Sequence, residues 1–511
     1  MAIRERYVRA AISGPLAVAA GLAAGELSAV RVSAFASPYR AVGAMLVDHS
    51  PAAAREFAIQ RFGTADKTAL LAGMAIVILL IAIAAGLLQV RRPPLGALVV
   101  VGFTGVGVFA AMTRPTATRV YAIPAVIAGI VAVIVLVVLC RTSTSSSSET
   151  GADEGPIWSR RQFVGAVAVL AAAGAGCVAL ARHVAESGGA LAERAGLRLP
   201  APVSPSRPVP AGADLRLAAA TPFTTANSAF YRIDTALAVP QLEVDDWRLR
   251  VHGMVDNEFT LTWDDLMAMP AVERIITLTC VSNEVGGDLA GNARWLGFPM
   301  RDILSRAGVA TDADMLLSTS VDGWTSGTPI SAITDGRDAL LAIGMNGEPL
   351  PIEHGYPVRQ VVPGLYGFVS ACKWVIDWEI TRFSEAQAYW TQRGWGEQAP
   401  IKTASRIDRP APLSTSPAGT VVVAGTCWAQ HRGIRSVEVR VDDGPWQQAT
   451  LAPEYSTDTW RQWSWNWAAT PGQHTLYCRA TDRSGATQPE QRAAPIPDGA
   501  TGWHSRVLRI E

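Results

Sequence analysis

The 511-residue chain lacks several patterns that would assign it to common protein classes. It has no CxxC pair, which removes the basis for a zinc-ribbon or iron–sulfur site. Its six cysteines are too few and too scattered for a disulfide-stapled scaffold. No glycine-rich loop of the dinucleotide or Walker type is present. The formal net charge is zero, so no nucleic-acid partner is predicted, since that needs a basic surface.

Charged residues are almost absent from five long stretches before residue 182, the only one being Glu26. Each stretch has roughly 19 to 23 residues, enough to cross a hydrocarbon core. They are Ala10–Val30, Thr68–Val90, Leu95–Thr113, Val120–Cys140 and Phe163–Ala181. We therefore predict a membrane region over residues 1–182 with about five transmembrane helices, and the Ala34–Lys67 connection has room for a short interfacial helix.

Basic residues near the ends of these stretches predict the orientation. Three arginine groups fall on one side if the N-terminus is cytoplasmic: Arg4, Arg6 and Arg9; Arg91 and Arg92; Arg160 and Arg161. The first external loop is also basic, which weakens this rule. An odd number of spans places everything after residue 182 on the outer face of a cell membrane.

Histidine is missing from the predicted spans, since none of the seven histidines lies inside one. A membrane-embedded b-type haem needs facing histidines, so no haem is predicted in this chain. The segment Ser159–Val164 (Ser-Arg-Arg-Gln-Phe-Val) resembles a twin-arginine export motif, a route taken by proteins already folded around a cofactor. The two arginines equally satisfy the positive-inside rule.

Beyond the membrane region, three segments differ in composition and in predicted secondary structure. Residues 183–220 are rich in Ala, Pro and Gly and are predicted to be an extended linker. Residues 221–400 mix short strands and helices and are predicted to form an α+β domain. Residues 401–511 alternate short strands with turns, which predicts an immunoglobulin-like β-sandwich. Cys427 and Cys478 lie in early and late strands of it, as a disulfide or as two buried thiols.

One cysteine stands out by its position. Cys280 ends a β-branched run (Ile275–Cys280) and is followed by a polar, glycine-bearing loop to Asp288. Alone, it is best interpreted as a buried structural thiol. A soft thiolate at a strand end, backed by a flexible loop and an arginine, also suits a metal that works on oxyanions.

The motifs that follow Cys280 change that balance. They occur in this order: Ala293-Arg294-Trp295, Met345–Pro351 (Met-Asn-Gly-Glu-Pro-Leu-Pro), His354–Arg359 (His-Gly-Tyr-Pro-Val-Arg), Val362–Gly364 and Lys373-Trp374. This order resembles the sulfite oxidase family of molybdopterin enzymes, over about Thr221–Glu511. The resemblance implies a molybdopterin domain over residues 221–400 and a dimerisation domain over residues 401–511.

The resemblance also implies residue roles. Cys280 matches the protein's only molybdenum ligand, and His354 and Arg359 match contacts to the pterin phosphate. The segment Phe230-Tyr231-Arg232 is similar to an early cofactor segment that places Arg232 near the metal. The remaining implied cofactor contacts are Asp322, Ser370, Ala371 and Lys373.

Two further residues bear on the substrate. Arg294 is similar to an arginine that holds an anion near the metal, for which a planar guanidinium is well suited. Trp395 stands near where animal sulfite oxidases carry an active-site tyrosine, and an indole cannot relay a proton as a phenol can. Sulfite is therefore only one candidate substrate.

The sequence thus predicts a membrane-anchored, molybdenum–molybdopterin oxidoreductase that transfers an oxygen atom to or from a small oxyanion or S-oxide. An external cytochrome or quinone-linked carrier would exchange its electrons, and a homodimer is expected. Two alternatives stay open: a sulfoxide reductase of the same fold, and a non-catalytic membrane docking protein.

Overall fold

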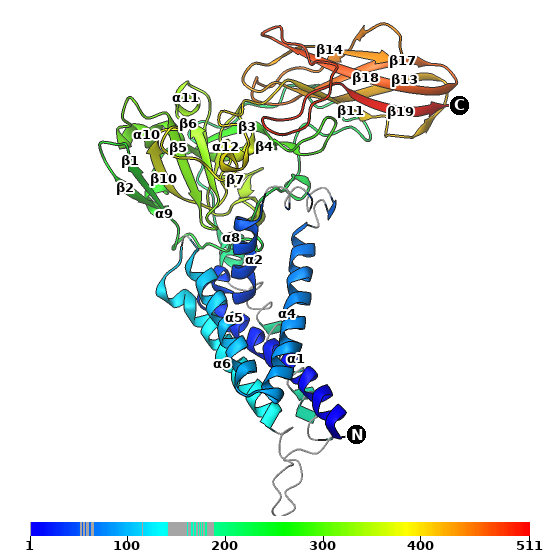
Figure 1. Cartoon of the computed structure of the whole chain (residues 1–511). Helices are drawn as coiled ribbons and strands as arrows, with labels where there is room; N and C mark the ends of the chain where they lie inside the picture. Colours follow the sequence, from blue (N-terminus) through cyan, green and yellow to red (C-terminus); the bar gives the residue numbers. More distant parts are fainter. Residues whose placement is uncertain are drawn as a thin grey trace, which may run out of the picture. The chain divides into compact units, whose positions relative to one another are not determined.

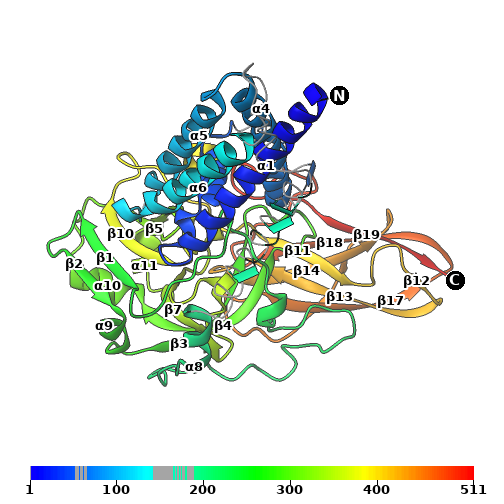
Figure 2. The ribbon, with the colours of Figure 1, turned by 90° about the horizontal axis from the view of Figure 1, so that it is seen from below.

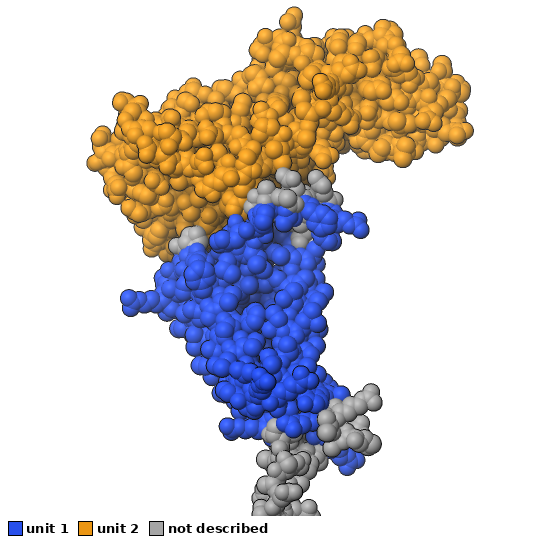
Figure 3. Space-filling model, viewed as in Figure 1, with its two compact units in different colours: residues 1–192, 235–241 blue, residues 193–234, 242–511 orange. Residues whose placement is uncertain are grey.

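The computed structural model describes residues 2–51, 66–114, 116–141 and 189–511, with scattered positions between 54 and 62 and between 161 and 180. They form two compact units (Figure 3). The first, here called the helical unit, comprises Met1–Ala192 and Thr235–Gln241. The second, the β-rich unit, comprises Glu193–Asp234 and Leu242–Glu511.

Long apolar helices build the helical unit (Figure 1). Its elements are α1 (Ala2–Ala29), η1 (Ala34–Ala36), α2 (Pro38–His49), α4 (Asp66–Arg91), α5 (Leu95–Met112), η3 (Arg119–Tyr121) and α6 (Ala122–Arg141), and α8 (Ala190–Gly196) begins in it. Small residues let α1 and α4 approach closely, since a Cβ on Gly14 would lie 1.8 Å from the Ala82 carbonyl oxygen. Many large apolar side chains, such as Leu80 and Phe109, point outward.

Four helical segments in the described residues are long and apolar enough to cross a membrane. They are Arg6–Ala29, Lys67–Arg91, Leu95–Met112 and Arg119–Arg141, and they coincide with the first four predicted stretches. The predicted fifth span, Phe163–Ala181, and the twin-arginine-like segment, Ser159–Val164, lie largely outside the described residues. The Ala34–Lys67 connection contains the short helix α2, which Ser37 caps by accepting from the Arg40 N–H.

The first part of the β-rich unit contains two sheets, ordered β2-β1-β10-β5-β6 and β3-β4-β7-β8, with β9 paired to β7. The strands are β1 (Arg248–Gly253), β2 (Phe259–Thr262), β3 (Val272–Thr279), β4 (Ala290–Pro299), β5 (Met315–Ser320), β6 (Thr325–Pro329), β7 (Leu340–Met345), β8 (Glu348–Pro349), β9 (Arg359–Val361) and β10 (Val375–Thr381). Short helical elements join them: η4 (Asn227–Ala229), α9 (Trp263–Met267), α10 (Met300–Ala307), α11 (Ser331–Thr334), η5 (Ile352–His354), α12 (Gly367–Ser370) and η6 (Thr391–Arg393). The antiparallel pair β3–β4 carries Cys280 at its end, which makes this sheet the frame of the site.

The second part consists of two sheets that share one apolar core, so residues 401–511 form a β-sandwich (Figure 2). One sheet is ordered β11-β13-β17-β16 and the other β12-β19-β18-β14-β15. The strands are β11 (Ala404–Arg409), β12 (Thr415–Ser416), β13 (Gly419–Trp428), β14 (Ile434–Val441), β15 (Gln447–Gln448), β16 (Thr450–Leu451), β17 (Arg461–Ala469), β18 (Gly472–Asp482) and β19 (His504–Ile510). Cys427 and Cys478 are buried free thiols on strands of opposite sheets.

The predicted linker over residues 183–220 needs correction where the structure describes it. The chain is extended but docked: the Val203 N–H donates to the Ala271 carbonyl at 2.8 Å, and the Leu215 N–H donates to Gln462 Oε1 at 2.6 Å. A second correction concerns Thr235–Gln241, which belongs to the helical unit. Lys67 Nζ donates to the Ala236 carbonyl at 2.9 Å because this segment lies against the helices.

Candidate active site

Cys280 stands directly after β3, at the start of the loop Val281–Asp288. Its N–H donates to the Leu289 carbonyl at 2.9 Å, which ties together the two ends of the loop. The side chain is buried. Burial raises the pKa of the Cys280 thiol, while hydrogen bonds from Ser282 and from the Val281 N–H lower it. These donors would stabilise a thiolate once a metal ion takes the place of its proton.

An aromatic group lies on the face of β4 that carries Gly291 and Trp295. The Phe230 ring stacks on Tyr231 with centroids 5.2 Å apart and meets Trp295 edge-on at 5.7 Å and His354 edge-on at 5.6 Å. Gly291 leaves room for it, since a Cβ there would lie 2.5 Å from the ring. The cluster forms an apolar, rigid wall.

Tyr231 connects this wall to the cysteine. Burial raises the pKa of Tyr231, the charge of Cys280 raises it further, and the charge of Arg359 lowers it. Tyr366 also lies within electrostatic range of Cys280, and burial is the main cause that raises the pKa of Tyr366 to about 12. Both phenols therefore stay protonated around the thiol at neutral pH.

Arg359, the first residue of β9, is a buried cation without a carboxylate partner among the described residues. In the described part of the chain, its guanidinium donates to backbone carbonyls alone, those of His354 at 3.1 Å, Gln360 at 3.4 Å and Ala371 at 3.5 Å. It also lies over the Trp295 ring, 5.1 Å from the centroid. Burial lowers the pKa of Arg359 to about 10. A buried charge normally has a counter-charge, so this arrangement favours an anionic ligand.

A second buried charge group surrounds Lys373. Its Nζ lies 3.0 Å from Asp234 Oδ2, and Asp234 also accepts from Arg232 Nε at 2.7 Å. Burial lowers the pKa of Lys373 to about 8 against the opposing charge of Asp234. Burial raises the pKa of the Asp322 carboxyl, the charge of Asp234 raises it further, and the charge of Lys373 lowers it. Three predicted cofactor residues, Arg232, Asp322 and Lys373, are thus brought together.

His354 is held in one tautomer by its surroundings. Nε2 lies 3.1 Å from the Asn227 carbonyl oxygen and therefore carries a proton that it donates. Burial and the charge of Arg359 lower the pKa of His354 to about 4, so the ring is neutral at pH 7. A bound anion at Nδ1 would need a proton there, so anion binding and protonation of His354 are linked.

Comparison with known proteins tests the interpretation of this site. Residues 236–390 match the family model described as oxidoreductase molybdopterin binding domain. The chain is 34% identical over 158 residues to the oxidoreductase YuiH of Bacillus subtilis, which covers 31% of this chain and 76% of that protein. It is also 30% identical over 332 residues to the mitochondrial sulfite oxidase of Homo sapiens, covering 54% of this chain and 58% of that protein.

The chain belongs to the sulfite oxidase family of molybdopterin-binding oxidoreductases. It spans 58% of the length of the mitochondrial sulfite oxidases of rat and human. The crystal structure of the sulfane dehydrogenase SoxCD from Paracoccus pantotrophus aligns with a TM-score of 0.49 at 23% identity, covering 57% of this chain and 84% of that one.

The donor set fits the cofactor of this family. Cys280 offers one buried thiolate, and in the described residues no group of three His, Cys, Asp or Glu side chains could hold a metal ion by itself. Arg359 and Lys373 are buried cations, which suits a phosphate group, and the aromatic cluster around Phe230 is apolar, which suits a ring system beside it.

Some predicted site residues are not brought into this cluster. Arg294 alternates with Trp295 on β4, so its side chain lies on the opposite face, where Nε pairs with Glu273 at 3.3 Å. Trp395 packs against Phe368 and Trp390, and no hydrogen bond in the described residues joins it to Cys280.

Ser370 and Ala371, two of the predicted cofactor contacts, lie beside the site but make hydrogen bonds within the protein. The Ser370 hydroxyl is 3.1 Å from the Leu365 carbonyl and 3.0 Å from that of Tyr366 and donates to this backbone. The Ala371 carbonyl accepts from Arg359. A contact from Ser370 to a cofactor would have to use its oxygen lone pair.

Two residues of the site, Asp234 and Tyr366, are not among those that the sequence motifs predict. Asp234 pairs with two of the predicted cations, and Tyr366 lies within electrostatic range of the thiol. An acidic residue two positions after Arg232 was a visible signal for an ion pair. Nothing in the sequence pattern singled out Tyr366, since its position depends on α12 approaching the end of β3.

Proposed function

We propose that this chain is a membrane-anchored molybdenum oxidoreductase that moves an oxygen atom to or from the sulfur of a small oxyanion or S-oxide. The observation that carries the proposal is a buried thiol at a strand end and a buried guanidinium, with Tyr231 within electrostatic range of both. In the described residues the acceptors of this guanidinium are all backbone carbonyls. Family membership supports the same cofactor. When bound, the molybdenum–molybdopterin group would supply the redox chemistry and the transferable oxo group.

The chain's own residues would then bind and orient. Cys280 would hold the metal, with Ser282 donating to its sulfur. Arg359 and Lys373 would hold the phosphate, and Phe230 would exclude water from one side. Arg232 is 40% exposed and paired to Asp234, so its remaining donors are accessible to an oxyanion.

The remaining parts of the proposal concern the whole protein. The four apolar helices support anchoring in a cell membrane, and we propose that the β-rich unit lies on the outer face, delivered by the twin-arginine-like segment. We propose that the β-sandwich is immunoglobulin-like and mediates a homodimer. Electrons would pass to or from an external cytochrome or quinone-linked carrier.

A metal analysis combined with a two-directional assay tests the proposal. Purified full-length protein should contain nearly stoichiometric molybdenum and should oxidise sulfite with an artificial acceptor or reduce small S-oxides with an artificial donor. Protein free of molybdenum after expression in a cofactor-producing host would instead support a non-catalytic docking role.

A further inference from the structure

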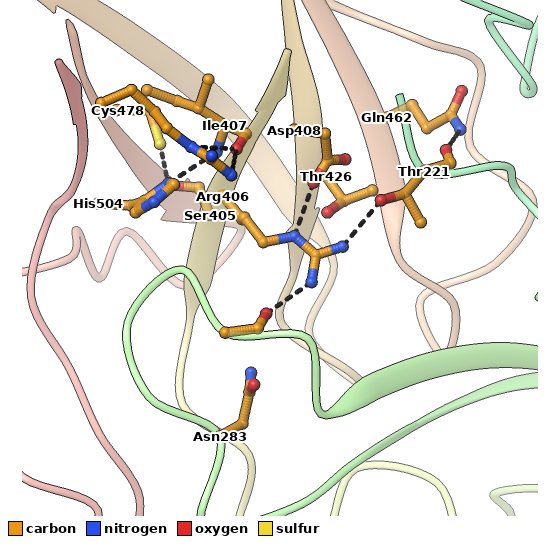
Figure 4. A network of polar contacts seen from close by, with 12 residues as sticks. Thr221, Asn283, Ser405, Arg406, Ile407, Asp408, Thr426, Gln462, Cys478 and His504 are labelled. Carbon is orange, nitrogen blue, oxygen red and sulfur yellow. Dashed lines mark hydrogen bonds and ion pairs between the residues drawn. The ribbon is translucent and has the colours of Figure 1, made fainter. Parts of the chain in front are cut away.

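The loop that follows Cys280 is held from the β-sandwich. Arg406 on β11 donates from Nη1 to the Gly287 carbonyl at 2.6 Å (Figure 4). The Arg406 side chain is buried. A residue of the β-sandwich therefore holds the backbone of the loop Val281–Asp288, which follows Cys280, by a hydrogen bond.

All three nitrogens of this guanidinium have partners, which fixes its direction. Nε donates to Asp408 Oδ1 at 2.7 Å, and Nη2 donates to Thr221 Oγ1 at 3.0 Å (Figure 4). A lysine could reach one of these acceptors but not all three, because its ammonium is a single point of donation. The geometry is specific to arginine.

His504 supports the same loop from beneath. A Cβ on Gly286, where φ is +80°, would lie 2.2 Å from His504 Cδ2, so the bare glycine backbone rests on the imidazole ring. His504 Nδ1 accepts the Ile407 N–H at 2.9 Å, which anchors the ring to β11 beside Arg406 (Figure 4). Arg406 lies on β11, and His504, the first residue of β19, is tied to the next residue of β11, so the two supports meet at one place in the sandwich.

Inside the loop, short hydrogen bonds connect these supports to the cysteine. Asn283 Oδ1 accepts the Leu289 N–H at 2.9 Å, and the Asn283 N–H donates to the Cys280 carbonyl at 3.1 Å. Cys280 itself donates to the Leu289 carbonyl. Because these hydrogen bonds join Asn283 and Leu289 to Cys280, a displacement of Gly287 would also move the Cys280 sulfur.

We propose that Arg406, with His504 beneath the loop, is a positioning residue that sets the orientation and accessibility of the Cys280 sulfur. Its importance for turnover rests on the proposed function, because only a metal-ligand thiolate needs this precision. The β-sandwich then contributes to the metal site as well as to any assembly of chains.

Thiol labelling in the cofactor-free protein tests this proposal without turnover. Full-length protein from a host unable to make molybdopterin is alkylated with iodoacetamide, and each cysteine is followed by mass spectrometry. Arg406→Met should speed labelling of Cys280 by about tenfold or more, corresponding to about 1.4 kcal/mol in local opening. Amide exchange over residues 281–289 should increase with it.

Arg432→Met is the matched control. Arg432 pairs with Asp482 at 3.0 Å and donates to the Ile401 carbonyl at 3.0 Å, within the same sandwich but without a hydrogen bond to the loop. It should leave Cys280 labelling at the wild-type rate. Unchanged labelling in Arg406→Met, or an equal increase at Cys427 and Cys478, would overturn the proposal, because the latter means general loosening.

Arg406→Lys covers the case in which the methionine variant does not fold. It keeps a positive charge for Asp408, and labelling of Cys280 should be faster than in wild type; a wild-type rate would overturn the proposal. In the loaded protein, Arg406→Lys should alter the paramagnetic signal of molybdenum at unchanged metal content. Absence of molybdenum from the wild-type protein would overturn the proposed function and leave the labelling result valid.

Discussion

Lys373 Nζ lies 3.0 Å from Asp234 Oδ2, and both side chains are buried. The pair joins the start of β10 to the segment that carries Phe230 and Arg232, which are far apart in the sequence. Asp234 also pairs with Arg232, so one carboxylate organises two cations of the candidate cofactor site. Charge balance, as well as apolar packing, therefore shapes this site.

Replacing Asp234 with Asn should destabilise the protein strongly. It leaves Lys373 as a buried charge without its partner, and removal of one member of a buried pair costs about 3–5 kcal/mol. The midpoint of thermal unfolding of the full-length protein in detergent measures this. Asp312→Asn is the control, because Asp312 pairs with Arg382 at the exposed surface and should change the midpoint little. Equal effects of the two substitutions would contradict the importance assigned to the buried pair.

Local patterns in the sequence predict much of this fold. The first four apolar stretches coincide with the four long apolar helices, and the alternating run Trp247–Gly253 is β1 (Arg248–Gly253). The run Gln447–Leu451 has the local pattern of one strand, but it divides between the two sheets as β15 and β16. The pattern of apolar residues predicts where strands form, but it does not predict where the chain passes from one sheet to the other.

The site shows the same limit. Ordered motifs predict Cys280, His354, Arg359 and Lys373 as site residues. His354 and Lys373 lie within electrostatic range of Arg359, and Tyr231 lies within range of both Arg359 and Cys280. Arg294 was placed with them because of its neighbours in sequence, yet strand alternation turns it to the other face of β4. Arg406 could not be predicted, because its contact with Gly287 depends on how β11 packs against the loop.

Cys280→Ser should remove molybdenum and turnover while the fold and bound pterin remain. Serine is nearly isosteric, so packing is preserved, but a hydroxyl is a harder and far less acidic ligand than a thiol. Metal analysis, pterin fluorescence after oxidation and circular dichroism separate these effects. Cys427→Ser is the control: it is also a buried thiol, and it should keep its molybdenum. Full activity of Cys280→Ser would reject Cys280 as the metal ligand.

The substrate anion provides a test between two arginines. The family resemblance implies that Arg294 holds the anion, whereas we expect Arg232 to do so, because it lies in the charge group of Lys373 and Asp234. Losing a charge-assisted hydrogen bond costs about 1.5–3 kcal/mol, so Arg232→Gln should raise the KM for the anionic substrate by roughly 10- to 100-fold. Arg294→Gln should leave KM nearly unchanged if its role is the ion pair with Glu273. The reverse result would restore the sequence assignment.

The stability of the protein should fall as the pH is lowered from about 6.5 towards 4. Burial, followed by the charges of Arg506 and Arg406, lowers the pKa of His504 to about 3, and burial lowers that of His354 to about 4. In this window the unfolded chain binds protons that the folded chain excludes, so acid favours unfolding, by up to about 1.4 kcal/mol per pH unit for each histidine.

His504→Asn tests the sign of this dependence, because an amide oxygen can accept the Ile407 N–H without titrating. Its unfolding midpoint should fall less between pH 6.5 and pH 4 than that of the wild type. His474 is the contrasting control, since its hydrogen bond to Asp442 raises the pKa of His474. Its contribution is fully present below the unfolded pKa and is lost only as the pH rises through the folded pKa, so His474→Asn should lower the midpoint but leave its fall between about pH 6 and pH 4 close to that of the wild type. A wild-type slope in His504→Asn would mean that His504 does not exclude a proton in the folded state.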